Sequence, residues 1–448
     1  MQNAIFYHIY PLGMCNAPRK NDFTAQPVPR LEMIHEWIPH LRELNVNALY
    51  LGPVFESTAH GYDIADFFRV DRRLGTNESL SALSDALHQN GIRLVLDAVF
   101  HHVGRDFWAF RDLLQNGERS AYRHWFSGID FTQRSPYNDP FAYDGWAGHF
   151  DLVKLNLHEP EVRQHIFDAI QFWVDKFQID GLRLDVADKL DMDFMHALSS
   201  HAHNIRPDFW LMGEVIHGDY NHWVNPQTLD SVTNYECYKG LYSSHEDKNY
   251  FEIAYSLNRQ FGSTGLYRNQ LFYNFVDNHD VNRLASNLTN PAHLYTTYCL
   301  LFTMSGIPSI YYGSEWGMEG IRTDKDDSSL RPSLTLTQAK ESAPHPNLPN
   351  TIRHLAQIRL ASPALLYGDY AQLYVNHEQF AFARFLNNEY VIVALNASAE
   401  KAAIEFDVPL KDGTILNDIL NENQTVTVRN GKLKVEINPH WAVIVRHK

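Results

Sequence analysis

The sequence predicts an α/β protein: a (β/α)₈ (TIM) barrel with an insertion domain after the third strand and an antiparallel β-sandwich at the C-terminus. Three observations support this fold class. Short apolar runs with few charges, typical of strands buried on both faces, alternate with segments of helical period. Eight such runs precede residue 362, the number that a closed barrel needs. After about Ser362 the pattern changes to short strand-like runs separated by NN, DG and NG turns.

The barrel elements can be assigned in chain order. The predicted strands are Ile5–Tyr10, Ala48–Val54, Arg93–Val99, Gly181–Asp185, Phe209–Glu214, Ser231–Tyr235, Leu271–Val276 and Ser309–Tyr312. The helices expected between them include Met33–Leu44, Leu80–Gln89, Glu161–Gln178, Phe194–Asn204 and His293–Met304. In the segment Glu161–Gln178, apolar residues recur every three or four positions and form one helical face.

Two stretches interrupt this alternation. Val103–Leu152 has no long periodic segment and is rich in aromatic residues, Gly and Pro, and Met318–Pro349 is also irregular. We therefore expect the barrel in residues 1–102 and 153–362, the insertion domain in 103–152 and the sandwich in 363–448. The strands predicted for the sandwich are Ala371–Val375, Gln379–Phe385, Val391–Ala394, Thr425–Arg429 and Ala442–Val445.

Composition excludes several classes of function. The formal net charge of −15 argues against a nucleic-acid groove or an anionic membrane surface, and it disfavours phosphorylated substrates. No apolar run is long enough to span a membrane, and the N-terminus lacks the basic residues of a secretory signal. The 3 cysteines are too few and too scattered for a disulfide framework or a cysteine-based metal site. We expect a cytoplasmic, globular protein.

Polar residues gather where the predicted strands end, which is the face that carries the active site of a (β/α)₈ barrel. They are Tyr62 and Asp63 after the second strand, Asp97, His101 and His102 at the third, Arg183, Asp185, Asp188 and Lys189 at the fourth, Glu214 at the fifth, and Asp277, Asn278, His279 and Asp280 at the seventh. Polar groups at such positions are costly unless they meet each other or a ligand. We therefore expect them to form one site.

Each of these residues also has a structural explanation when it is taken alone. An Asp in a strand-to-helix loop commonly caps the helix, and Arg183 suits a buried ion pair. His102 and His279 suit hydrogen-bonded positions in the core, and Tyr62 suits packing. Metal ligation is a further alternative for clustered Asp and His. Capping, however, does not require Arg-x-Asp on one strand, Glu on the next and His-Asp on another.

The alternation of side chains along a strand predicts the chemistry. Arg183 and Asp185 lie on the same face of their strand, so the guanidinium should lower the pKa of Asp185. Glu214, on the next strand beside that negative charge, should have a raised pKa. A carboxylate nucleophile and a carboxylic acid with separated pKa values are typical of a retaining glycosidase. Asp280 would support the transition state, His102 and His279 would donate to sugar hydroxyls, and Tyr62 would offer a ring face.

The motifs DAVFHHV, GLRLDVADK, GEV and FVDNHD resemble the four conserved regions of the α-amylase family of glycoside hydrolases, family 13, and DLVKLN resembles its short region at the end of the insertion. The resemblance covers essentially the whole chain. It implies Asp185 as nucleophile, Glu214 as general acid/base and Asp280 as transition-state stabiliser. It further implies Arg183, His102 and His279 around the sugar, Asp97 supporting Arg183, and Tyr62 as the stacking tyrosine.

The segments FWAFRDLLQNGERSAYRHWF and HGYDIADFFRVDRRLGT most resemble the neopullulanase, cyclomaltodextrinase and maltogenic amylase branch. That branch usually carries an N-terminal β-domain that supports dimerisation, whereas this chain begins at the first barrel strand; we expect a monomer or weak homo-oligomer. His101 stands where the family usually has an Asn that is a calcium ligand in many relatives. Because imidazole is a poor ligand for calcium, we expect no metal and no cofactor.

The sequence therefore predicts a retaining hydrolase of α-1,4-glucosidic bonds in malto-oligosaccharides or related α-glucans, without nucleic-acid or membrane partners. A 4-α-glucanotransferase or other transglycosidase, or an exo-acting α-glucosidase, would use the same three carboxylates. The pair Asp188 and Lys189, on the acceptor side, departs from the residues usual in the family and does not separate these alternatives. A sugar-binding protein without activity is a more remote alternative on the same fold.

Overall fold

The computed structural model describes residues 1–323, 326–421 and 424–447. Its main sheet has eight parallel strands in the order β11-β10-β9-β5-β2-β1-β13-β12. The strands are β1 (Phe6–Ile9), β2 (Ala48–Leu51), β5 (Arg93–Ala98), β9 (Gly181–Leu184), β10 (Trp210–Gly213), β11 (Ser231–Val232), β12 (Tyr273–Asn274) and β13 (Ile307–Tyr311). A parallel bridge between Thr233 and Tyr273 joins the two ends of this sheet, so the barrel closes as predicted.

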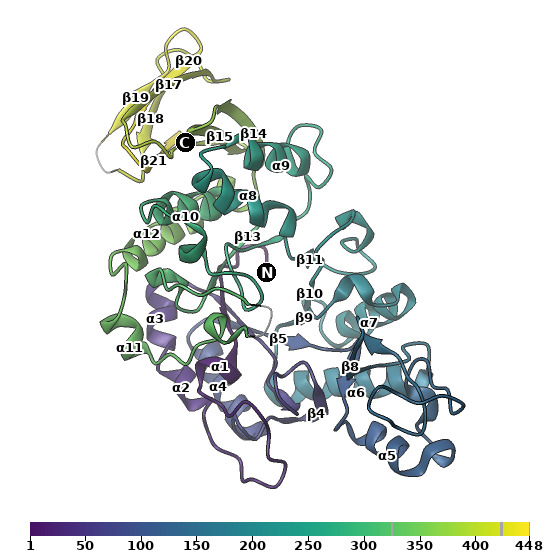
Figure 1. Cartoon of the computed structure of the whole chain (residues 1–448). Coiled ribbons are helices and arrows are strands. Elements are labelled where there is room, and N and C mark those ends of the chain that lie inside the picture. The colour runs from purple at the N-terminus through teal and green to yellow at the C-terminus, as the bar shows by residue number, and fades with distance from the viewer. Residues whose placement is uncertain (324–325, 422–423, 448) are drawn as a thin grey trace.

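Helices surround the barrel and pack their apolar faces on it (Figure 1). They include α4 (Asn77–Gln89), α6 (Pro160–Phe177), α7 (Met192–Ile205), α8 (Tyr235–Glu246), α9 (Phe251–Phe261), α10 (His293–Thr303) and α12 (Leu348–Leu360), with the short α1 (Pro11–Met14), α11 (Leu336–Glu341) and α13 (Pro363–Tyr367). The single helix expected at Met33–Leu44 is two, α2 (Glu32–His35) and α3 (Ile38–Glu43). Pro39, in the first turn of α3, has no N–H to continue the hydrogen-bond ladder from α2.

The segment after the third barrel strand folds beside the barrel as a small antiparallel sheet with one helix (Figure 1). Its strands are β6 (His102–Gly104), β8 (His149–Lys154) and β7 (Gly145–Trp146), in that order, and its helix is α5 (Trp108–Asn116). Aromatic side chains form its interior: the Phe110 ring lies edge-on to Phe126 at 5.1 Å and to Tyr143 at 5.0 Å. A hairpin, β3 (Phe55–Ser57) and β4 (Ile64–Val70), carries Tyr62 in its connecting loop.

The C-terminal segment is an antiparallel β-structure in two layers, as expected. One sheet has the order β14-β15-β16-β21-β18-β19, and the other pairs β17 with β20. The strands are β14 (Asp369–Val375), β15 (Gln379–Leu386), β16 (Glu389–Asn396), β17 (Ala402–Asp407), β18 (Ile415–Asp418), β19 (Thr425–Thr427), β20 (Lys432–Ile437) and β21 (Trp441–His447). The layers enclose a core of their own, which includes Ile392, Ile404 and Leu433. Among the described residues, no helix is long and apolar enough to cross a membrane.

Candidate active site

A single guanidinium organises the carboxyl ends of three neighbouring barrel strands. Arg183, on β9, donates from Nη1 to Asp97 Oδ1 and to Asp185 Oδ1, each at 2.8 Å. Its Nη2 lies 2.9 Å from Glu214 Oε2. The parallel register makes this possible, because Asp97 on β5 lies directly opposite Arg183. All four side chains are at most one-tenth exposed, so these charges interact with little screening by water.

The two carboxyl groups that follow β9 and β10 each keep one oxygen available. Asp185 Oδ2 lies 4.0 Å from His102 Nε2 and makes no hydrogen bond to any described residue. Glu214 Oε2, besides its contact with Arg183, accepts a hydrogen bond from the backbone N–H of Val186 at 3.1 Å. Within the described chain Glu214 Oε1 has no such partner. Each group is therefore held by one oxygen and presents the other.

The backbone at Val186 contributes to this arrangement. Val186 has φ 42° and ψ 46°, the left-handed region that a β-branched residue rarely adopts. The turn reverses the chain immediately after Asp185 and directs the Val186 N–H to Glu214. Strained backbone of this kind commonly occurs at active sites.

A second group of residues extends the site from the seventh strand. His279 Nε2 lies 3.0 Å from Asp280 Oδ2 and is also hydrogen-bonded to the Tyr62 hydroxyl. The same hydroxyl donates to Asp97 Oδ2 at 3.2 Å, and Tyr50 donates to that oxygen at 2.7 Å. Contacts therefore connect Asp280 to the Arg183 cluster. The structure brings into one cluster the eight residues to which the sequence assigned a role in the chemistry: Tyr62, Asp97, His102, Arg183, Asp185, Glu214, His279 and Asp280.

The pKa values correct one expectation. Burial raises the pKa of Glu214, as expected, but burial also raises the pKa of Asp185 well above its usual value, against the effect of Arg183. The prediction of a low pKa for Asp185 is wrong because burial, together with the negative charges of Glu214 and Asp97, outweighs the effect of Arg183. At Asp280, burial acts in the same upward direction, but His279 and Arg331 outweigh it and lower the pKa.

Other acidic residues near the strand ends have structural roles. Asp180 accepts a hydrogen bond from the Leu94 N–H at 2.7 Å, so it lies where β5 begins and not where it ends. Asp277 Oδ2 accepts from the Leu284 N–H at 2.8 Å and from the Ser314 hydroxyl at 2.7 Å. For these residues the structural explanation holds.

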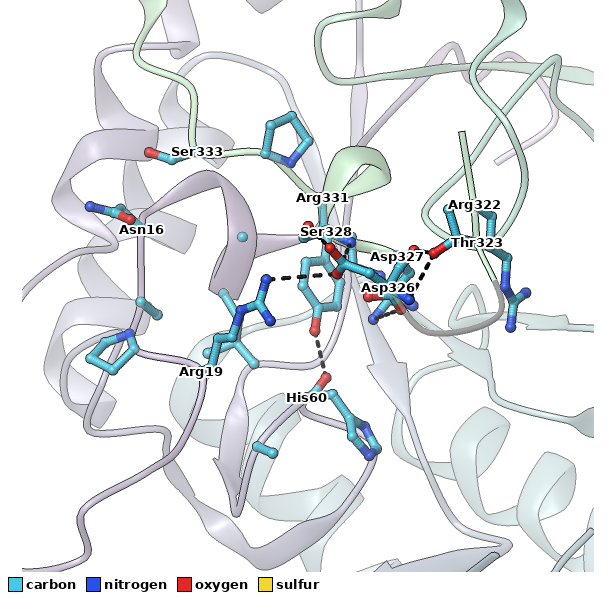
Figure 2. A pocket seen from close by; sticks show the side chains of 17 residues that line it. Asn16, Arg19, His60, Arg322, Thr323, Asp326, Asp327, Ser328, Arg331 and Ser333 are labelled. Carbon is cyan, nitrogen blue, oxygen red and sulfur yellow. Dashed lines mark hydrogen bonds and ion pairs between the residues drawn. The ribbon is translucent and has the colours of Figure 1, made fainter. Parts of the chain in front are cut away.

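The sequence did not single out Arg331, which lies in the stretch expected to be irregular. Its Nη2 donates to Asp280 Oδ1 at 2.9 Å, and its Nη1 lies 2.8 Å from Asp327 Oδ2. Arg331 also lines a cavity of about 620 Å³, together with Tyr10, Arg19, His60, Arg322 and Asp327 (Figure 2). The three clustered carboxyl groups do not line this cavity, which adjoins them through Arg331. The charged pair Asp327 and Arg331, four residues apart, was the signal available in the sequence.

His101 lies beside a second imidazole and near a positive charge. Its Nδ1 lies 3.3 Å from His102 Nδ1, and burial together with the positive charge of Lys154 lowers the pKa of His101 to about 4. In the insertion, Asp139 is already bound by Arg105 at 2.8 and 2.9 Å. No cluster of three or more His, Cys, Asp or Glu side chains suited to a metal occurs in residues 1–323, 326–421 and 424–447.

Comparisons with known proteins identify the family of this chain. Residues 18–345 match the α-amylase catalytic domain, and residues 370–445 match the C-terminal domain of neopullulanase-like proteins. The chain is 32% identical to neopullulanase 2 of Thermoactinomyces vulgaris, over 99% of this chain and 77% of that protein. The debranching enzyme of Nostoc punctiforme is 29% identical with a TM-score of 0.83, over 99% of this chain and 98% of that one. Cyclic α-maltosyl-(1→6)-maltose hydrolase of Arthrobacter globiformis is 26% identical with a TM-score of 0.82, over 100% and 98%. The chain thus belongs to the α-amylase family of glycoside hydrolases, family 13.

Proposed function

We propose that this protein hydrolyses α-1,4-glucosidic bonds in malto-oligosaccharides or related α-glucans with retention of configuration, using Asp185 and Glu214. One observation carries the assignment of these two residues. Each binds Arg183 through one oxygen, Oδ1 of Asp185 and Oε2 of Glu214, and leaves the other free of hydrogen bonds to described residues. This is the arrangement that a nucleophile and a proton donor on neighbouring strands require.

The reaction proceeds in two displacements. In the first, Asp185 Oδ2 attacks the anomeric carbon and the glycosidic C–O bond breaks, while Glu214 gives its proton to the departing oxygen. The product of this step is a glycosyl ester on Asp185. In the second, a water molecule gives a proton to Glu214 and attacks the same carbon, which releases the sugar and restores the carboxylate of Asp185.

The raised pKa values indicate that Asp185 and Glu214 share a proton. Asp97, Asp185 and Glu214 surround the single positive charge of Arg183, and burial opposes further negative charge. Such a pair titrates as a unit and readily holds one proton. The reactive form has that proton on Glu214 and the charge on Asp185.

The remaining residues bind and orient the sugar. Asp280, whose pKa is lowered, stays ionised and would stabilise positive charge at the anomeric centre or accept sugar hydroxyls. His102 and His279 would donate to hydroxyls, and Tyr62 would provide a ring face. Asp97 positions Arg183 through the same nitrogen, Nη1, that binds Asp185. We assign no step to a metal or cofactor.

We also propose that the protein acts in the cytoplasm as a monomer or weak homo-oligomer, with a glucan as its only partner. Cys15, Cys237 and Cys299 are all free and buried, as suits a reducing compartment. One relative, 27% identical, is the intracellular maltogenic amylase of Bacillus subtilis. Light scattering of the purified chain would measure the oligomeric state.

The variant Asp185→Asn tests the nucleophile. We expect turnover of maltohexaose to fall by roughly four orders of magnitude while the melting temperature stays near that of the wild type, because a nucleophile cannot be bypassed. Asp193→Asn, the same change at an exposed position of α7, is the matched control and should retain activity. Proton NMR of the wild-type reaction should show the α-anomer first.

Near-wild-type activity of Asp185→Asn, or a β-anomer as first product, would contradict the proposal. Chromatography of the products from maltotriose then separates the alternatives. Glucose and maltose indicate hydrolysis, whereas products longer than maltotriose indicate transfer to a sugar acceptor.

A further inference from the structure

One imidazole that the proposed mechanism does not use lies in the barrel interior beside the active site. His8, on β1, is 2% exposed. Its ring stacks on that of Tyr50, with 4.2 Å between centroids, and lies perpendicular to the ring of His279 at 5.2 Å. The Tyr50 hydroxyl donates to Asp97 Oδ2. His8 therefore contacts both parts of the site, the cluster around Asp97 and the pair of His279 and Asp280.

The surroundings of His279 require a proton on its Nε2. This nitrogen lies 3.0 Å from Asp280 Oδ2, and an ionised carboxylate only accepts hydrogen bonds. It also contacts the Tyr62 hydroxyl, which gives its own proton to Asp97 Oδ2 and is therefore an acceptor here as well. The hydrogen bond made by one nitrogen of an imidazole decides which nitrogen carries the proton, so the partner of Nδ1 matters.

Each of the two histidine rings has one buried nitrogen without a hydrogen-bond partner. They are His279 Nδ1 and His8 Nε2, and neither is paired with any described residue. Buried polar atoms in folded proteins almost always have a partner, either a protein group or an ordered water. A centroid separation of 5.2 Å leaves room for at most one water molecule between the rings, so the two nitrogens can satisfy each other.

The other groups around His279 have their protons committed elsewhere. The titratable and charged groups that face it are His8 and Tyr10 at the first strand, Tyr62 in the hairpin loop, Glu214 after β10, Asp280 beside it, and Arg331. The Tyr10 hydroxyl donates to His60 O at 2.7 Å, and Arg331 donates to His279 O and to Asp280. Glu214 needs its proton for the leaving group. Within the described chain, His8 is thus the donor that remains for Nδ1.

His8 can donate without adding a charge to the site. Burial lowers its pKa well below the usual value, and the nearby Arg183 guanidinium acts in the same direction. The ring is therefore neutral at the pH where the carboxyl groups react. A neutral imidazole carries one N–H and one lone pair, so a proton on His8 Nε2 can meet the lone pair of His279 Nδ1.

We propose that His8 is a positioning residue for His279: its Nε2–H donates to His279 Nδ1, directly or through one water molecule, and so keeps the proton of His279 on Nε2. The inference rests on the proposed function and deepens it. A neutral His279 leaves the negative charge of Asp280 available to the positive charge that develops at the anomeric carbon. With a proton on both nitrogens, His279 would compensate the charge of Asp280 and weaken this support.

The test compares His8→Phe, which keeps a ring but removes both nitrogens, with His8→Gln, which keeps a donor. In His8→Phe, kcat/KM for maltohexaose at about pH 7 should fall about fivefold, mainly through kcat. His279 Nδ1, left without its donor, then takes up a proton more readily. The acid limb of the pH profile should therefore move to higher pH, and the loss at about pH 5 should be about fivefold greater still. His8→Gln should restore most of both losses.

His245→Phe is the matched control. His245 is also fully buried and has one ring nitrogen, Nε2, without a partner among the described residues, while its Nδ1 is bound to Leu241 O at 2.8 Å. It lies on α8 and packs on Tyr250 and His293, not on the active site. The acid limb of this variant should coincide with that of the wild type.

An acid limb that stays in place in His8→Phe would overturn the proposal, since a purely structural role lowers activity at every pH alike. If His8→Phe does not fold, His8→Asn gives the same comparison, because its amide is too short to reach Nδ1 and its acid limb should also move. A double-mutant cycle provides a second measurement. In a His279→Phe background His8→Phe should cost no further activity, and an additive loss would also overturn the proposal. Failure of the proposed function is distinct, because wild-type protein would then release no sugar from any α-glucan.

Discussion

In the proposed mechanism Glu214 supplies the proton that the leaving group needs. A substrate whose leaving group departs without a proton therefore tests this role of Glu214 alone. Burial raises the pKa of Glu214, so the proton is lost only as the pH rises, and activity on maltohexaose should fall on the alkaline side. In Glu214→Gln, hydrolysis of maltohexaose should drop by at least about a hundredfold. With α-glucosyl fluoride, whose fluoride leaves unprotonated, the formation of the glycosyl-enzyme should lose its alkaline limb.

The pH profiles of wild type, Glu214→Gln and Glu405→Gln provide the measurement. Glu405 is exposed on β17 and tests the chemical change alone. An alkaline limb that persists unchanged in Glu214→Gln would identify another residue as the acid.

Side-chain order along a strand predicted much of this site, because residues two apart share a face. Arg183 and Asp185 meet as the Arg-x-Asp spacing requires. The pKa of Asp185 could not be predicted in this way, since it depends on burial and on the other carboxyl groups around the guanidinium. Asp97 lies 86 positions before Arg183 and reaches it only through strand register. Arg331 was missed for a similar reason, because no strand or helix pattern places it.

The end of α10 illustrates how elements are joined. Its last carbonyls lack helical partners, and two buried arginines supply donors. Arg359 of α12 donates to Phe302 O at 2.8 Å and Met304 O at 3.2 Å, and Arg384 of β15 donates to Thr303 O at 3.0 Å. Burial lowers the pKa of Arg359 to about 9 and that of Arg384 to about 10. These contacts connect the barrel to the C-terminal sheet.

Replacing Arg384 should therefore destabilise the fold without touching the active site. Arg384→Ala leaves Thr303 O and Gly368 O without their donor and opens a cavity, and we expect a loss of about 3 kcal/mol in the free energy of unfolding. Denaturant unfolding measures it, with the exposed Arg429→Ala as control, expected within about 0.5 kcal/mol of wild type. A loss of under about 1 kcal/mol in Arg384→Ala would show that water replaces the donor.

Elements were predictable where burial is extreme. The barrel strands are apolar runs because helices cover the outer face of each strand and the barrel interior buries its inner face. Three sandwich strands, β17, β18 and β20, were not predicted, although β17 and β20 alternate between buried and exposed residues. Their sequences, such as KLKVEI, are half polar and contain no apolar run, so apolar runs alone do not identify them as strands. Period-two alternation was the signal that would have found them.

At the scale of the whole molecule, carboxylates of the insertion that could bind a cation are held by side chains of the insertion itself. Asp139 is bound in bidentate fashion by Arg105, and the guanidinium lies 4.3 Å from the centre of the Tyr137 ring. Asp130 accepts hydrogen bonds from the Thr132 N–H at 2.8 Å and from Gln133 at 2.7 Å. These carboxylates already have partners, so a cation would have to displace them.

The positive charge of Lys154 leads to an expectation for metal removal that no observation has yet tested. The positive charge of Lys154 acts on His101, at the place where many family members bind calcium, and it would repel a second cation. A cation held only by the folded state stabilises it by mass action, so its removal must lower the melting temperature. We expect EDTA to leave both the melting temperature and the rate on maltohexaose unchanged, as measured by differential scanning calorimetry and a reducing-sugar assay. A drop in melting temperature that calcium reverses and magnesium does not would show that this junction binds calcium in spite of Lys154 and His101.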